Sequence, residues 1–102
     1  MSSRNIAAYP NQTTTSGSIE LLQNGPNPFI EMTLLWFKLP AKGRVVLRVF
    51  DSEGREVYTY NNLFDKGENH ILLRRSDLKE PGIYAYQVES EYGIARRHLV
   101  MY

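Results

Sequence analysis

Two prolines separated by a single residue restrict this chain more than any other feature of its sequence. Pro26 and Pro28 lie in the heptapeptide Gln23-Asn24-Gly25-Pro26-Asn27-Pro28-Phe29. Each proline fixes its own φ and keeps the preceding residue out of the helical region, so the stretch is extended and excludes a helix. Phe29 is the first large aromatic residue that a core could take up. We therefore predict a fixed corner at which a linker enters a domain, with Pro26, Pro28 and Phe29 as structural residues.

The residues before the corner are mostly small and polar. They include Pro10, the run Thr13-Thr14-Thr15 and the sequence Ser16-Gly17-Ser18. Such a composition cannot bury enough apolar surface to offset the conformational entropy that is lost on folding. We predict a flexible linker over residues 1–18 and one folded domain over residues 19–102, which suits a chain of 102 residues.

The domain consists of short apolar runs separated by turns. In the run 44–50, Val45, Leu47 and Val49 share one face of a strand, and the next turn ends at Gly54, which can adopt positive φ. Residues 75–80 are the only helix-like piece, and residues 61–67 are expected to form a loop. Seven strands are predicted, at residues 19–22, 33–39, 44–50, 55–60, 68–74, 82–90 and 94–101. Their spacing predicts an all-β fold, an antiparallel β-sandwich of the immunoglobulin or fibronectin III type.

A tyrosine corner is predicted where residues 78–82 lead into a strand. Leu78 is followed by Pro81 and Gly82, and Tyr84 lies just inside the strand. The hydroxyl of Tyr84 should bond back to a main-chain group near Leu78 and fix the crossing between the sheets. We therefore assign structural roles to Gly82 and Tyr84. Gly54, at the turn described above, is assigned a structural role as well.

The composition argues against several classes of function. Lys and Arg number 12 and Asp and Glu number 11, so the one-sided basic surface of a nucleic-acid-binding protein is not expected. The absence of cysteine excludes disulfides and thiolate metal sites, and no apolar run is long enough to span a bilayer. His70 and His98 lack the spacing of metal ligands, and no nucleophilic triad is visible. We expect no enzyme activity, no metal and no cofactor.

One strand presents an apolar row on its outer face. If Thr33, Leu35, Phe37 and Leu39 point to the core, then Met32, Leu34 and Trp36 point outward. Such a row should not be left in water. Either the linker or a long loop covers it, which we favour, or it is a contact surface for a partner or a sugar, since tryptophan is common at binding hot spots.

The last strand carries two adjacent arginines, Arg96 and Arg97. They are either simply solvated or they protect a sheet edge from pairing with another chain. A chain that ends on a strand also presents an end that a receptor can reach. Composition alone does not choose among these roles.

Five motifs in order resemble one known family. They are Leu21-Leu22-Gln23-Asn24 with Pro26-Asn27-Pro28-Phe29 and Thr33, then Leu39-Pro40, then Val49-Phe50-Asp51 with Gly54-Arg55-Glu56-Val57, then Gly67-Glu68, then Gly82-Ile83-Tyr84 with Tyr86. Over residues 19–102 the sequence resembles the type A C-terminal sorting domain of the type IX (Por) secretion system. It is also similar to the immunoglobulin-like domain of the flagellar hook-capping protein family.

The resemblance implies a seven-stranded sandwich at the C-terminus of a secreted cargo, with Tyr102 as the natural end of the protein. The parent protein would carry a separate signal peptide, cross the periplasm, and reach the cell surface or the medium. The implied partners are the type IX translocon, its shuttle components and a cell-surface sortase that removes the domain and attaches the cargo; we expect a monomer. Translocon recognition is expected at Gly93, Arg96, Arg97, His98, Leu99 and Val100. Cleavage is expected in the linker, at Gly17-Ser18.

A second function remains open on the sequence. The same sandwich also serves as a structural, adhesive or sugar-binding immunoglobulin-like module that stays in the mature protein. The fold does not separate the two functions, because β-sandwiches serve both.

Overall fold

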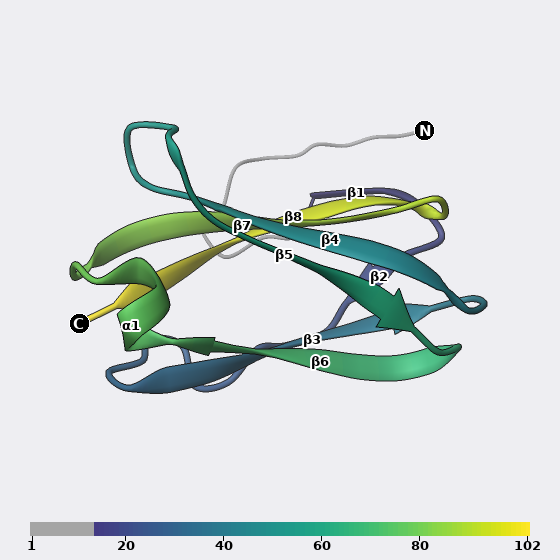
Figure 1. Ribbon diagram of the computed structural model, residues 1–102, viewed down its shortest axis with the longest axis horizontal. Helices are drawn as coiled ribbons and strands as arrows, with labels where there is room; N and C mark the ends of the chain where they lie inside the picture. The colour runs from purple at the N-terminus through teal and green to yellow at the C-terminus, as the bar shows by residue number, and fades with distance from the viewer. Residues whose placement is uncertain (1–13) are drawn as a thin grey trace, which may run out of the picture.

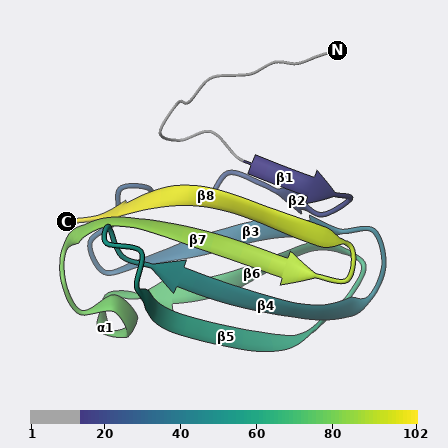
Figure 2. The ribbon, with the colours of Figure 1, turned by 90° about the horizontal axis from the view of Figure 1, so that it is seen from above.

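The computed structural model of the chain describes residues 14–102 and consists of two antiparallel β-sheets packed face to face (Figures 1 and 2). One sheet has the strand order β1-β8-β7-β4-β5 and the other has the order β2-β3-β6. The elements are β1 (Thr14–Gly17), β2 (Glu20–Leu21), β3 (Met32–Leu39), β4 (Gly43–Phe50), β5 (Glu56–Phe64), β6 (Gly67–Arg74), α1 (Arg75–Leu78), β7 (Gly82–Ser90) and β8 (Gly93–Met101). The predicted all-β sandwich is confirmed. Within residues 14–102, no helix has the length and hydropathy needed to cross a bilayer.

All seven predicted strands are present, with two differences beside them. β5 continues to Phe64, so the loop predicted at residues 61–67 is wrong over its first half. Asn61 and Asn62 suggested a loop, but they pair with Val46 and Val45 of β4. A strand at the edge of a sheet tolerates polar residues, which is why composition misled the prediction here. The second difference is β1, which lies within the range predicted to be a linker and pairs with β8.

The core follows the alternation predicted from the sequence. On β3, the side chains of Thr33, Leu35, Phe37 and Leu39 are buried, while Met32 and Lys38 are exposed. Val45, Leu47 and Val49 of β4 and Tyr84, Tyr86 and Val88 of β7 face the same core. Alternate side chains of a strand point to opposite faces, so one buried residue sets the orientation of the whole strand.

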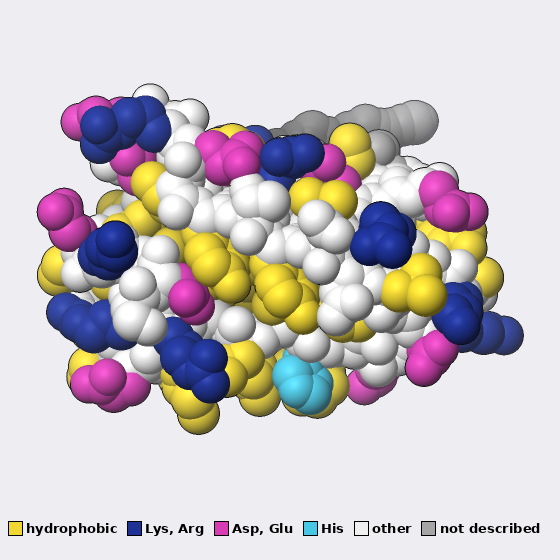
Figure 3. Space-filling model, in the orientation of Figure 1, with side chains coloured by type: hydrophobic (Ala, Val, Ile, Leu, Met, Phe, Trp, Pro, Cys, Tyr) yellow, Lys and Arg dark blue, Asp and Glu magenta, His cyan; other side chains and the backbone are white. Residues whose placement is uncertain are grey.

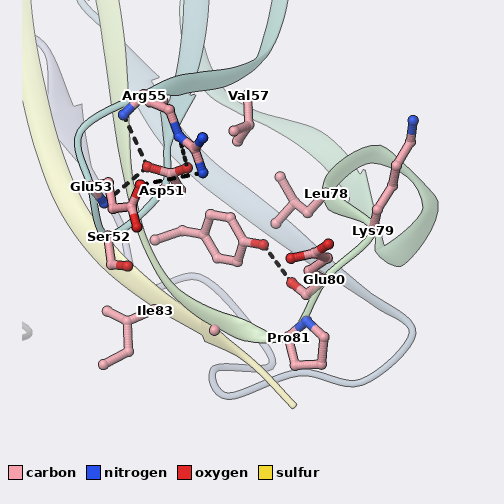
Figure 4. Close-up of a pocket in the computed structure, with 12 residues that line it drawn as sticks. Asp51, Ser52, Glu53, Arg55, Val57, Leu78, Lys79, Glu80, Pro81 and Ile83 are labelled. Atoms are coloured by element: carbon pink, nitrogen blue, oxygen red, sulfur yellow. Dashed lines mark hydrogen bonds and ion pairs between the residues drawn. The ribbon is translucent and has the colours of Figure 1, made fainter.

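The tyrosine corner is present at the start of β7. The Tyr84 side chain is only 5% exposed, and its hydroxyl donates a hydrogen bond to the main-chain oxygen of Glu80 (Figure 4). The acceptor lies two residues beyond Leu78, near which the sequence predicted it. Burial raises the pKa of the Tyr84 hydroxyl above its ordinary value. The hydrogen bond joins the connection after α1 to the start of β7.

We predict that Tyr84→Phe lowers the free energy of unfolding by about 1 kcal/mol or more, because the Glu80 carbonyl loses its partner in a partly buried place. Urea denaturation followed by circular dichroism measures the loss. Tyr92→Phe is the matched control: its hydroxyl also binds a main-chain carbonyl, that of Lys42, but in an exposed place where water can substitute. Equal effects of the two substitutions would contradict a special role for Tyr84.

Candidate functional site

The terminal strand β8 lies inside its sheet and not at the edge. All nine of its residues pair with β7, from Gly93 opposite Ser90 to Met101 opposite Gly82. On its other side, its first four residues pair with β1, from Arg96 opposite Thr14 to Gly93 opposite Gly17. Figure 2 shows β8 between β7 and β1. A receptor therefore does not meet an open strand edge over the first half of β8.

The proline-asparagine corner covers the second half of the same edge. The side-chain oxygen of Asn27 accepts a hydrogen bond from Val100 N at 3.0 Å, and its amide nitrogen lies 3.5 Å from His98 O. Phe29 N donates to Val100 O at 3.0 Å, and Tyr102 N donates to Phe29 O at 2.9 Å. Asn27 and Phe29 thus pair with main-chain groups at the end of β8, as a neighbouring strand would.

The corner is fixed to the opposite sheet as well. Gly25 and Leu34 of β3 exchange two main-chain hydrogen bonds, at 3.0 and 3.2 Å. The buried hydroxyl of Thr33 donates to Pro26 O at 2.6 Å. Because the corner is bonded to β3 on one side and to β8 on the other, it joins the two sheets at the terminal strand. Phe29 is buried, and the peptide bonds before Pro26 and Pro28 are both cis.

Two further arginine contacts hold the end of the chain. Arg75 of α1 donates through Nη1 to Ile30 O at 2.9 Å and also to Tyr102 O. Arg97 donates through Nη1 to Leu22 O at 2.8 Å. Both contacts join β8 or its end to the segments that enter and leave the corner.

The adjacent arginines of β8 lie on opposite faces of the sheet. Arg96 points outward: its guanidinium lies 4.9 Å from the centre of the Phe50 ring, and Nη1 donates to Gln87 Oε1 at 3.0 Å. Arg97 is half-buried and points toward the corner. Arg97 is therefore not simply solvated, whereas Arg96 is exposed on the outer face.

The other predicted recognition residues divide in the same way. His98 is exposed on the outer face beside Ala85, and Val100 is half-buried on that face beside Ile83. Leu99 is fully buried in the core, and Gly93 lies at the β7–β8 turn with a φ of 136°. The structure thus brings Arg96, His98 and Val100 together on one surface and places Gly93, Arg97 and Leu99 elsewhere.

A polar network beside Arg96 was missed by the sequence analysis. Arg48 of β4 binds Glu89 of β7 at 2.9 Å and Glu56 of β5 at 3.3 Å, and Gln87 also donates to Glu89 at 2.6 Å. The hydrogen bond that Arg48 donates to Glu89, together with the negative charge of Glu89, raises the pKa of Arg48. The alternation of β4 placed Arg48 on the outer face, but only the sheet order brings its partners beside it.

The residues predicted for cleavage lie at the end of β1. Gly17 pairs with Gly93 and has a φ of 84°, and Ser18 N donates to Tyr92 O at 2.8 Å. A β-carbon at Gly17 would lie 2.2 Å from Tyr92 O, so the approach of the two main chains requires glycine. The rest of the predicted linker, residues 1–13, lies outside the described residues.

The predicted apolar row lies on the outer face of the smaller sheet. Met32 is 52% exposed, Leu34 and Trp36 are half-buried, and the Trp36 ring lies 4.6 Å from that of His70 on β6. Within residues 14–102, the row lies at the surface and contacts the neighbouring strand β6 through Trp36 and His70.

Asp51, at the surface depression in Figure 4, is engaged in local hydrogen bonds. The depression, of about 370 Å³, lies between the turn after β4 and the connection from α1 to β7. The Asp51 carboxylate accepts hydrogen bonds from Glu53 N, Arg55 N and Arg55 Nε, each at 2.9 Å. The bond from Arg55 N is the largest of the causes that lower the pKa of Asp51. Among residues 14–102, no three His, Cys, Asp or Glu side chains form a group that could hold a metal ion.

We predict that Asn27→Ala speeds hydrogen exchange at the Val100 amide at least about fivefold, because the amide loses the acceptor worth roughly 1 kcal/mol that protects it. Exchange measured by NMR at each amide tests this. The Tyr102 amide is the internal control, since its acceptor is Phe29 O and is not altered by the substitution. Asn27→Asp, which keeps an acceptor oxygen, should retain most of the protection. Unchanged exchange at Val100 in Asn27→Ala would show that the corner does not cover the edge of β8.

Comparisons with known proteins agree with this architecture. The family model of the secretion system C-terminal sorting domain matches residues 26–101. No curated protein matches the sequence. The crystal structure of the C-terminal domain of Wzt is similar in fold, with a TM-score of 0.51 at 10% sequence identity, covering 90% of this chain and 78% of that chain. With a family model matched from the proline-asparagine corner to the end of β8, the chain belongs to the secretion system C-terminal sorting domain family, the sorting domain of the type IX system.

Proposed function

We propose that this domain, in its folded form, is the signal that takes its cargo through the type IX outer-membrane translocon, and that the translocon reads the outer face of β8. The supporting observation is the engagement of the β8 main chain on both sides, by β7 and by β1 with the corner. A receptor that meets the folded domain is then left with the outward side chains of β8. Arg96 and His98 are the exposed polar residues of that face, and Val100 lies beside them.

The six residues expected to act in recognition take two roles in this proposal. Arg96, His98 and Val100 contact the translocon or its shuttle component. Gly93, Arg97 and Leu99 hold β8 in place: Gly93 forms the turn, Leu99 fills the core, and Arg97 binds Leu22 O. A sorting domain of this family belongs to a cargo that is secreted or placed on the cell surface, and we propose that the cargo's own signal peptide takes it to the periplasm.

Sortase removal and surface attachment extend the proposal. A cut between Gly17 and Ser18 would leave β1 on the cargo and the rest of the sandwich on the released domain. Proteases bind their substrates in extended form, and this bond follows a strand paired with β8. We therefore propose that β1 leaves β8 before the sortase acts.

The proposal predicts that the double substitution Arg96→Ala and His98→Ala reduces export of an attached periplasmic reporter at least about tenfold, the factor expected when contacts worth roughly 1.4 kcal/mol or more are lost. The full chain is fused to the reporter in a host with a type IX system, and reporter in the medium and on the cell surface is measured. Both side chains are exposed, so the melting temperature should stay within about 2 °C of that of the unsubstituted domain.

Arg44→Ala is the matched control, because Arg44 is an exposed arginine on the outer face of the same sheet but lies on β4. It should leave export unchanged. Export that survives the double substitution would contradict the proposed recognition face. A reporter that stays in the periplasm even with the unsubstituted domain would contradict the sorting function itself.

A further inference from the structure

Among residues 14–102, the sandwich is open on the side where β5 and β6 are the outer strands of their sheets (Figure 1). Tyr60 lies opposite Leu47, so it shares the inner face of its sheet, and yet it is 37% exposed. A groove of about 320 Å³ lies between the strands, with Tyr58, Tyr60 and Phe64 on one side and His70, Ile71 and Leu72 on the other. Figure 3 shows hydrophobic side chains gathered across the middle of this face. The five-stranded sheet thus overhangs a place where the three-stranded sheet would accept another strand.

β6 is suited to pair with an added strand. The other outer strand of its sheet, β2, has only 2 residues, whereas β6 has 8 and pairs with β3 in unbroken register. Arg75 N donates to Glu31 O on the β3 side, whereas Arg74 N donates to Asp77. Main-chain groups of successive residues point to opposite sides of a strand, so those of His70 and Leu72 point to the open side. A long outer strand without proline or a bulge is a template for pairing with another chain.

The charges of β6 indicate what that chain is. Glu68 and Arg74 lie three residues before and three residues after Ile71, and both are exposed. A second β6 that runs antiparallel about a two-fold axis at Ile71 sets Glu68 of each copy opposite Arg74 of the other. Opposite charges across a strand pair are stabilising, and like charges are destabilising. A shift of two residues in either direction sets Arg74 opposite Lys66 or His70 instead, so the charges favour one register.

We propose that this chain forms a two-fold dimer through antiparallel pairing of β6 with β6 of a second copy. His70 and Leu72 of the two copies exchange main-chain hydrogen bonds, and the smaller sheets join into one. The two Ile71 side chains meet at the axis, on the inner side and beneath Tyr60. On the outer face, Leu72 lies beside the His70 of the other copy, which extends the apolar surface around Trp36. The dimer replaces the monomer expected from the sequence, and it does not depend on the sorting function, because β8 lies in the other sheet.

Sedimentation equilibrium on the full chain tests the dimer. The unsubstituted chain should dimerise with rising concentration. Glu68→Arg and Arg74→Glu should each raise the Kd of self-association at least about tenfold, because each sets like charges opposite one another twice. An equimolar mixture of the two variants should dimerise again, because every facing pair is then of opposite charge.

Arg44→Glu is the matched control, the same change of charge on an exposed arginine of β4, and it should leave the Kd unchanged. Circular dichroism confirms that each variant is folded. The proposal is overturned if the unsubstituted chain is monomeric at every concentration, if neither charge reversal weakens self-association, if Arg44→Glu weakens it equally, or if the mixture fails to dimerise.

Discussion

The hydrogen bonds between the proline-asparagine corner and the terminal strand set the character of this domain. A strand without a neighbour exposes main-chain groups that either pair with another chain or stay in water. Here Asn27 and Phe29 occupy the place of that neighbour from His98 to Tyr102, and β1 occupies it from Gly93 to Arg96. Thr33 and Leu34 hold the corner from the other sheet. The contacts of the corner therefore decide both how the sandwich closes and what β8 can present.

In this arrangement, different side chains of β8 hold the strand in place and form its exposed surface. Side chains that point inward, such as Leu99, hold β8 to the core, and Arg97 holds it to the segment before the corner. Side chains that point outward contact neighbours on the surface of the sheet, as Arg96 contacts Gln87 and the face of Phe50. A module that serves as an address needs a surface that is constant in shape, and a strand bonded on both sides provides one. The family assignment and this geometry are consistent with each other, and neither requires a reactive group.

The two sides of the sandwich differ in how they are closed. On the side of β8, the corner and β1 cover the edges. On the side of β5 and β6, two long outer strands lie next to a groove lined by aromatic rings, and the short helix α1 contacts both strands. Edge protection is thus concentrated at the strand whose surface we propose is recognised, and the opposite side keeps the capacity to pair.

The sequence by itself determined the fold class, the alternation of side chains along β3 and β4, the turn at Gly54 and the tyrosine corner at Tyr84. These follow from local rules: a period of two along a strand, the φ that proline and glycine permit, and short-range hydrogen bonds. Only the tertiary structure decided that β5 runs to Phe64, that β1 joins the sheet, that Arg96 and Arg48 share a surface, and that Asn27 bonds Val100 across 73 positions of the chain. Sheet order and edge contacts arise from residues far apart in the sequence, and no local pattern records which of them will meet.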